Sequence, residues 1–322
     1  MTGAMEWISN FLYAAMLAGV PLLYGTLGEI LTEKAGNVNL GVEGMMYMGA
    51  VFGFMGAYYL DSAAAALLFA FLGGLGGALV YAFLTVTLKA NQNVAGLTLT
   101  IFGTGLANLL GTNMVNASGS GAAMVSDSIK AIFRPLDMGA LTALPYVGEL
   151  LFNHSILTYL GIVLAVGAGW YLNHTRKGLN LRAVGENPGA ADAAGVNVSL
   201  YKYVHTLLGG GICGLGGVYI ALVTCGGNWT YSCVGGLGWI AVALVIFAAW
   251  SPYKALLGSL VFGALSVLKL YIPASVVSIP SAFFSMLPFL VTCIILVISS
   301  IRMRRENQQP HSCGVNYFRE ER

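Results

Sequence analysis

The chain carries little charge for its size. Asp, Glu, Lys and Arg make up 9% of its 322 residues, whereas apolar residues make up 57%. Soluble domains carry roughly 25% charged residues, which they need to cover their surface. The composition therefore indicates a protein whose outside also faces membrane lipid. The net charge of +2, without a basic cluster before the short tail that begins at Arg302, gives no indication of a nucleic-acid partner.

Motifs for catalysis, metal binding and ATP binding are also missing. The five cysteines lack the CxxC spacing of metal sites, and their odd number argues against a disulfide framework. Cys225 and Cys233 share a predicted outer loop, and whether they pair stays open. The sequence has no P-loop, no HExxH and no nucleophile elbow. We expect no cofactor, no metal site and no catalytic residue.

Long apolar stretches recur along most of the chain. A membrane-spanning helix needs about 20 mostly apolar residues, and backbone polar groups in lipid must be satisfied within the segment. The predicted fold is an all-α polytopic membrane protein with about nine transmembrane helices. The predicted spans are Ile8–Leu27, Leu40–Leu60, Ala63–Leu88, Val94–Val115, Ile156–Leu172, Tyr203–Thr224, Leu237–Trp250, Ala255–Tyr271 and Phe283–Ser300.

Lys and Arg in the short connections set the expected orientation. With nine spans, the connection 174–202, the tail and the connections holding Lys34, Lys89 and Lys254 all lie on one side, which is the cytoplasm by the positive-inside rule. The long connection 116–155 then lies outside. We expect residues 1–301 to form a transmembrane permease domain and residues 302–322 a cytoplasmic tail. The expected location is a bacterial inner membrane, with multiple passes.

The cytoplasmic connection 174–202 contains signals for one short helix, Pro188–Ala194. Asn187 is a favourable N-cap, Pro188 suits the first helical position, and Gly195 is a helix stop. The small alanine faces of this helix suit a groove on a partner protein. An ordinary capped helix in a loop remains the alternative.

Glu43 lies in an otherwise apolar segment, where a carboxylate is costly and indicates function. Asn37 and Asn39 precede it, which favours an unwound helix start that lines a cavity. Alternatively, Glu43 caps its own helix near the membrane surface and pairs with Lys34. Both interpretations stay open.

The span Val94–Val115 is unusually polar. Thr100, Thr104, Asn108 and Thr112 recur every four residues and so share one face of a helix. Such a stripe either bonds to neighbouring helices or lines a wet path, and we favour the path.

Pairs of small residues four apart predict close helix contacts. Gly49–Gly53, Gly73–Gly77 and Gly210–Gly214 are such pairs, and small residues let helix backbones approach in lipid.

Three segments resemble permeases of nucleoside ATP-binding-cassette importers, within the family that also serves simple sugars and branched-chain amino acids. The segment 28–46 (GEILTEKAGNVNLGVEGMM) looks like its N-terminal signature, and the segment 181–195 (LRAVGENPGAADAAG) resembles its cytoplasmic coupling loop. The segment 236–245 (GLGWIAVALV), followed by 250–253 (WSPY), resembles a later block. Sugar permeases of the family tend to carry an Asp-Leu-Ser type sequence where this chain has Asn39-Leu40-Gly41, which favours a nucleoside.

The resemblance implies partners, and the patterns described above assign the residue roles. The partners are cytoplasmic ATPase subunits, a second permease subunit and an extracytoplasmic solute-binding protein, with lipid around the spans. The expected pathway residues are Asn39, Glu43, Thr100, Thr104 and Asn108. The expected ATPase-coupling residues are Gly185, Glu186, Asn187, Pro188, Ala190, Ala191, Ala194 and Gly195.

The function that the sequence favours is therefore a non-catalytic transport subunit whose partner hydrolyses ATP. A self-contained secondary transporter or channel for a small polar solute is the alternative. It would need several charges within the membrane for coupling, and Glu43 is nearly alone. A membrane-embedded enzyme lacks a catalytic cluster.

The topology can be tested by cysteine labelling in whole cells. We expect a cysteine at Gly189, in a variant without native cysteines, to resist a membrane-impermeant reagent until the cells are opened. A cysteine in the connection 116–155 should react from outside. Labelling of position 189 in intact cells would contradict the orientation.

Overall fold

The computed structural model describes residues 2–136, 139, 142, 147–272, 280–302 and 308–319. Within these residues the fold is helical, and the only extended pairing is an isolated bridge between Met124 and Asn228. The all-α prediction is therefore confirmed. The helices are α1 (Thr2–Lys34), α2 (Val42–Leu60), α3 (Ala63–Ala82), α4 (Gln92–Ala117), α5 (Asp127–Phe133), α6 (Val147–Phe152), α7 (Ile156–His174), α8 (Arg176–Glu186), α9 (Pro188–Ala193), α10 (Val198–Tyr219), α11 (Leu237–Phe247), α12 (Pro252–Tyr271) and α13 (Ser281–Arg302), with π-helical turns η1 (Phe83–Thr87) and η3 (Ile220–Thr224).

Six helices in the described part of the chain are long and apolar enough to cross a membrane. They are α1, α3 with η1, α4, α7, α10 with η3, and α12. The helix α2 has 19 residues, α11 has 11, and α13 contains the shorter apolar stretch 282–298. The count of nine spans stays a prediction.

The first predicted span ends too early. The helix α1 continues past Leu27 to Lys34, so Glu29 and Glu33 belong to the helix and are buried, at 0% and 5% exposure. The charged residues Glu29, Glu33 and Lys34 lower the apolar content of this stretch, so the sequence predicts a connection here. The expectation that Glu43 is nearly alone as a buried carboxylate is therefore wrong.

Glycines bring α2, α3 and α10 into backbone contact. A methyl group at Gly49 would lie 2.1 Å from Cα of Gly214, and one at Gly74 would lie 2.1 Å from the carbonyl oxygen of Gly210. One at Gly53 would meet Val218 at 2.6 Å. The glycine pairs thus form helix contacts, as the sequence predicts. Close packing at a glycine also joins α1 to α12, because a methyl group at Gly263 would lie 2.1 Å from the carbonyl oxygen of Ala15.

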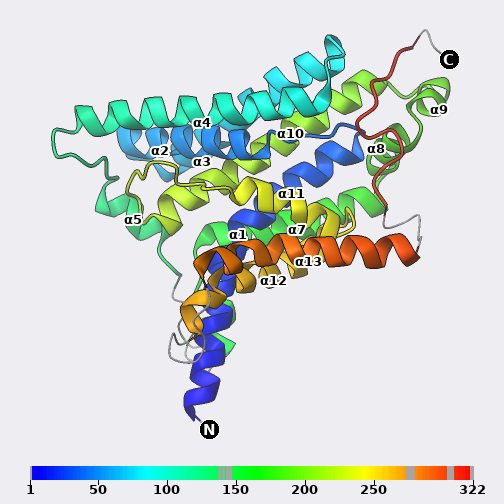
Figure 1. Ribbon diagram of the computed structural model, residues 1–322. Helices are drawn as coiled ribbons and strands as arrows, with labels where there is room; N and C mark the ends of the chain where they lie inside the picture. The colour runs from blue at the N-terminus through cyan, green and yellow to red at the C-terminus, as the bar shows by residue number, and fades with distance from the viewer. Residues whose placement is uncertain are drawn as a thin grey trace.

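The short basic connections gather at one end of the molecule, where Figure 1 shows α8, α9 and the C-terminal segment. Lys34, Arg182 and Lys254 line one cavity there, and Lys89 and Arg319 line another. This grouping agrees with the predicted sidedness of the charged connections. We refer to this as the cytoplasmic end, a name that follows the predicted orientation.

The opposite end is built from the connection 116–155 and the loop 225–236. The connection 116–155 is partly helical, because it contains α5 and α6. It pairs with the loop 225–236: Val125 donates its backbone N–H to the Gly227 oxygen at 3.0 Å, and Trp229 donates to Ala123 at 2.9 Å. Cys225 and Cys233 lie in this loop as free thiols.

Adding one methyl group to the α2–α10 contact should destabilise the protein. Gly49→Ala would overpack Gly214, which typically costs about 1–3 kcal/mol. Gly76→Ala is the matched control on α3, because a methyl group there meets no atom within 4 Å. Thermal unfolding in detergent measures both, and equal midpoints for the two variants would contradict the contact.

Candidate functional site

The carboxylate of Glu43 caps the N-terminus of a different helix, α11. Its Oε1 accepts the backbone N–H of Gly236 at 2.8 Å, and its Oε2 accepts that of Gly238 at 2.6 Å. Gly236 has φ +90°, which favours glycine, and a methyl group at Gly238 would lie 2.5 Å from Cα of Glu43. The first N–H groups of a helix have no partner within it, so a carboxylate satisfies them and complements the helix dipole.

This arrangement differs from both sequence interpretations of Glu43. The N-cap of α2 is Gly41, and no side chain caps that helix. Glu43 and Lys34 are both described, and no ion pair joins them. The carboxylate is 5% exposed and fixes α11 against α2. Its role in a pathway stays a prediction.

Asn39 lies in the segment 35–41 between α1 and α2, hereafter the α1–α2 turn. Its backbone N–H donates to Glu29 Oε1 at 2.9 Å, and its side-chain Oδ1 accepts the N–H of Gly41 at 2.9 Å. Both Asn39 and Glu29 are buried, at 1% and 0% exposure. The side chain of Asn39 thus shapes the backbone that leads to Glu43.

Side chains from other helices hold the same turn. Lys202 on α10 donates to the Gly36 oxygen at 3.3 Å, and Asn37 donates to the Thr206 hydroxyl at 3.1 Å. Gln92 on α4 accepts the N–H of Val38 at 2.7 Å. Sequence reasoning missed Glu29, Glu33 and Lys202. The i, i+4 spacing of the two glutamates is the signal that indicates one helical face.

The polar residues of α4 turn toward neighbouring backbone. The Thr100 hydroxyl donates to the Leu40 oxygen at 2.9 Å, and Asn108 accepts the Ser232 N–H at 3.3 Å. Thr104 bonds within α4, to the Thr100 oxygen. These three are half-buried, whereas Thr112 is exposed. The structure therefore brings Thr100 to the α1–α2 turn and Asn108 to the opposite end of the molecule.

A cavity of about 380 Å³ opens between α1, the α1–α2 turn, α11 and α13. Its lining includes Glu33, Leu40, Val242 and Trp250. The Trp250 indole N–H donates to Glu33. The five predicted pathway residues are not in this lining, although Leu40 directly follows Asn39. The cavity offers one carboxylate among mainly apolar side chains.

The predicted cytoplasmic helix is present as α9. Asn187 caps it by accepting the Ala190 N–H at 3.0 Å, Pro188 is its first residue, and Gly195 follows with φ +84°. It ends at Ala193, one residue earlier than predicted. A second helix, α8, precedes it and is not among the predicted elements, because its sequence is charged and its buried face has only two large apolar residues, Leu181 and Val184.

The two faces of α9 differ in exposure. Ala191 is 4% exposed and packs against Val184 and Val198, whereas Ala190 and Ala194 are exposed. This corrects the expectation that Ala191 offers its methyl group to a partner, because α8 and α10 already cover it. Gly185 is also buried, and a methyl group there would lie 2.4 Å from the Lys34 oxygen. Glu186 and Asn187 are exposed.

Comparison with known proteins shows that the chain is similar to permease components of transport systems. The family model described as branched-chain amino acid transport system / permease component matches residues 10–296. A nucleoside ABC transporter permease of Lactococcus lactis is 35% identical, covering 94% of this chain and 95% of its own. A guanosine ABC transporter permease of Bacillus subtilis is 30% identical, covering 99% of both. A Haloferax volcanii protein, provisionally named a glucose ABC transporter permease, is 38% identical over 83% of this chain and 78% of its own.

Replacing Glu43 should destabilise the protein even when the shape is kept. In Glu43→Gln one carboxylate oxygen becomes an NH₂ group, which cannot accept the N–H of Gly236 or Gly238. A buried donor without a partner costs about 1–3 kcal/mol. Glu6→Gln is the matched control, because Glu6 is exposed. We expect only the first variant to lower the thermal midpoint in detergent, and an unchanged midpoint would contradict the capping role.

Proposed function

The chain belongs to the family of branched-chain amino acid transport system permease components, and we propose that it imports a nucleoside or a related sugar-like solute. In this proposal it is a non-catalytic subunit of an ATP-binding-cassette importer. Permeases of such importers work with separate ATPase subunits and a solute-binding protein. The observation that carries the proposal is the match over residues 10–296, together with a capped helix, α9, exposed at the cytoplasmic end.

The proposed pathway runs beside the α1–α2 turn and the capped start of α11. Asn39, Glu43 and Thr100 each bond to the backbone there, so they shape this region. Thr104 and Asn108 extend the same helix face toward the opposite end. The short α11 resembles the interrupted helices that line transport sites, where irregular backbone is tolerated because it borders a cavity. In a nine-span arrangement, α2, α11 and α13 would be added to the six helices that are long and apolar enough to cross a membrane.

The proposed coupling runs from α9 to α1. ATPase subunits would contact the exposed residues Ala190 and Ala194, together with Glu186 and Asn187 at the start of the helix. Gly185 packs against the Lys34 carbonyl, so a displacement of α8 and α9 reaches the end of α1 directly. This chain would then transmit movement and perform no chemistry.

The cargo is proposed to be a nucleoside because the nucleoside permeases cover almost the whole chain. The relatives from Lactococcus lactis and Bacillus subtilis align over 94% and 99% of it, and the sugar-type relative aligns over 83%. The Asn39-Leu40-Gly41 sequence favours the same choice. Because Glu29, Glu33 and Glu43 are all buried, the number of buried charges no longer argues against a secondary transporter. Membership of the permease family does argue against it.

The cargo can be tested on the complex purified from native membranes through a tag on this chain. After reconstitution with its binding protein, we expect guanosine or another nucleoside to stimulate ATP hydrolysis, and glucose and leucine to have no effect. Stimulation by glucose or leucine alone would refute the nucleoside assignment. Purification without any ATPase subunit would refute the importer assignment.

The docking role of α9 can be tested with Ala190→Glu. Glu is favoured at the third helical position, so the helix should persist, while the larger side chain would clash with a closely fitting partner. Overpacking typically costs about 1–3 kcal/mol, which lowers docking about fivefold to a hundredfold. Ala122→Glu, at an exposed site in the connection 116–155, is the control. We expect only the first variant to lose ATPase subunits on purification, and full retention would exclude α9 as the docking helix.

A further inference from the structure

The C-terminal segment 308–319, hereafter the tail strap, lies across the cytoplasmic end beside α8 and α9 (Figure 1). Ser312 anchors its first part. Its backbone N–H donates to the Gly185 oxygen at 3.0 Å, and its hydroxyl donates to the same oxygen at 2.6 Å. Ser312 is 8% exposed, and burial raises the pKa of the adjacent Cys313 thiol. This part of the strap is therefore packed into the molecule.

Asn316 links the strap to the α1–α2 turn through one intermediate side chain. Its amide donates to the Lys89 oxygen at 2.6 Å, and its oxygen accepts from the Gln92 amide at 3.3 Å. The other end of Gln92 accepts the N–H of Val38 at 2.7 Å. Gln92 is 3% exposed, so this connection is shielded from water.

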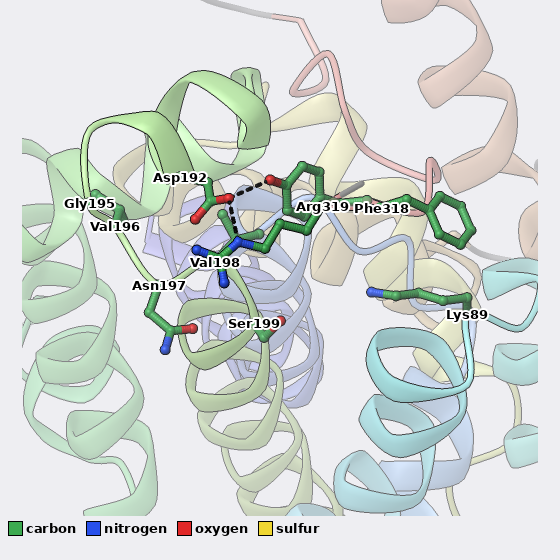
Figure 2. A pocket seen from close by; sticks show the side chains of 10 residues that line it. Lys89, Asp192, Gly195, Val196, Asn197, Val198, Ser199, Phe318 and Arg319 are labelled. Carbon is green, nitrogen blue, oxygen red and sulfur yellow. Dashed lines mark hydrogen bonds and ion pairs between the residues drawn. The ribbon is translucent and has the colours of Figure 1, made fainter. Parts of the chain in front are cut away.

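Asp192 links the strap to α9. Its Oδ2 accepts the Tyr317 hydroxyl at 2.8 Å and lies 3.3 Å from Nε of Arg319 (Figure 2). The Arg319 side chain is 76% exposed, so its ion pair contributes little. The Asp192 side chain is only 13% exposed, which makes the tyrosine bond to its carboxylate the stronger contact. The cavity drawn in Figure 2, about 520 Å³, lies between this contact and Lys89.

The three anchors together join parts of the chain that are far apart in sequence. Asp192 belongs to the helix for which we propose ATPase docking, and Val38 directly precedes Asn39 of the proposed pathway. The strap contacts both through adjacent residues, Tyr317 and Asn316. The strap transmits displacement between α9 and the α1–α2 turn only while the Tyr317 and Asn316 contacts hold.

We propose that residues 308–319 act as a positioning strap that couples movement of α9 to the α1–α2 turn. The strap ties the docking helix to the backbone beside Asn39, so that force from an ATPase subunit reaches the pathway. This inference rests on the proposed function, because it assumes that α9 receives that force. None of the strap residues contacts the cargo in this proposal.

The test compares uptake per ATP hydrolysed in reconstituted complexes. The double variant Asn316→Ala/Tyr317→Phe removes the Asn316 hydrogen bonds and the Tyr317–Asp192 hydrogen bond, and it keeps the Ser312 anchor and the exposed Arg319 ion pair. We expect ATPase subunits to remain bound and uptake per ATP to fall about tenfold or more, because about tenfold is the lower end of the effect on an equilibrium of losing a hydrogen bond to a charged group. Val315→Ala is the control, because Val315 is 61% exposed, and it should behave as wild type.

Each outcome of this test decides for or against the strap. Unchanged uptake per ATP in the double variant would overturn the proposal, as would loss of the ATPase subunits, which would make the strap a docking surface instead. If the double variant does not fold, Tyr317→Phe alone decides, since it removes a single oxygen atom. Failure of the docking proposal is seen separately, as full ATPase retention and uptake in Ala190→Glu.

Discussion

The contact between the Glu43 carboxylate and the N-terminus of α11 is the interaction on which the arrangement depends. A helix that begins inside a membrane protein leaves N–H groups without partners, and burying them unpaired is costly. Glu43 satisfies two of these groups, at Gly236 and Gly238, and so allows a helix of 11 residues to begin beside α2. The glycine contacts of α2 with α10 then set the position of this capped helix relative to the rest of the molecule.

The α1–α2 turn is the second centre of the structure. Its backbone is bound by Glu29 of α1, Gln92 of α4 and Lys202 of α10, all of them buried. Three helices therefore hold one short segment at the same time. The turn leads directly to Glu43, and the cytoplasmic connections pack on its other side. The proposed transmission of movement from α9 to a pathway would need such a junction.

Structural features that arise from residues close together in the sequence, within about one helical turn, could be predicted from the sequence alone. The helix α9 was expected from Asn187, Pro188 and Gly195, because a cap, a first-turn proline and a glycine stop act through local backbone geometry. The glycine pairs were predicted to be contacts for a similar reason, since a stripe of small residues marks a helix face. The gathering of the basic connections at one end was predictable from their charge, whereas their side of the membrane stays a prediction.

The sequence by itself determined that the chain is helical, that it resides in a membrane and that one capped helix lies among its basic connections. Only the tertiary structure decided which helix Glu43 caps, because its partners lie 193 and 195 residues away. It also decided that Ala191 faces inward and that Ser312 binds Gly185, 127 residues earlier. A side chain's partner across the fold depends on how whole helices pack. Composition and periodicity report only the face on which that side chain lies.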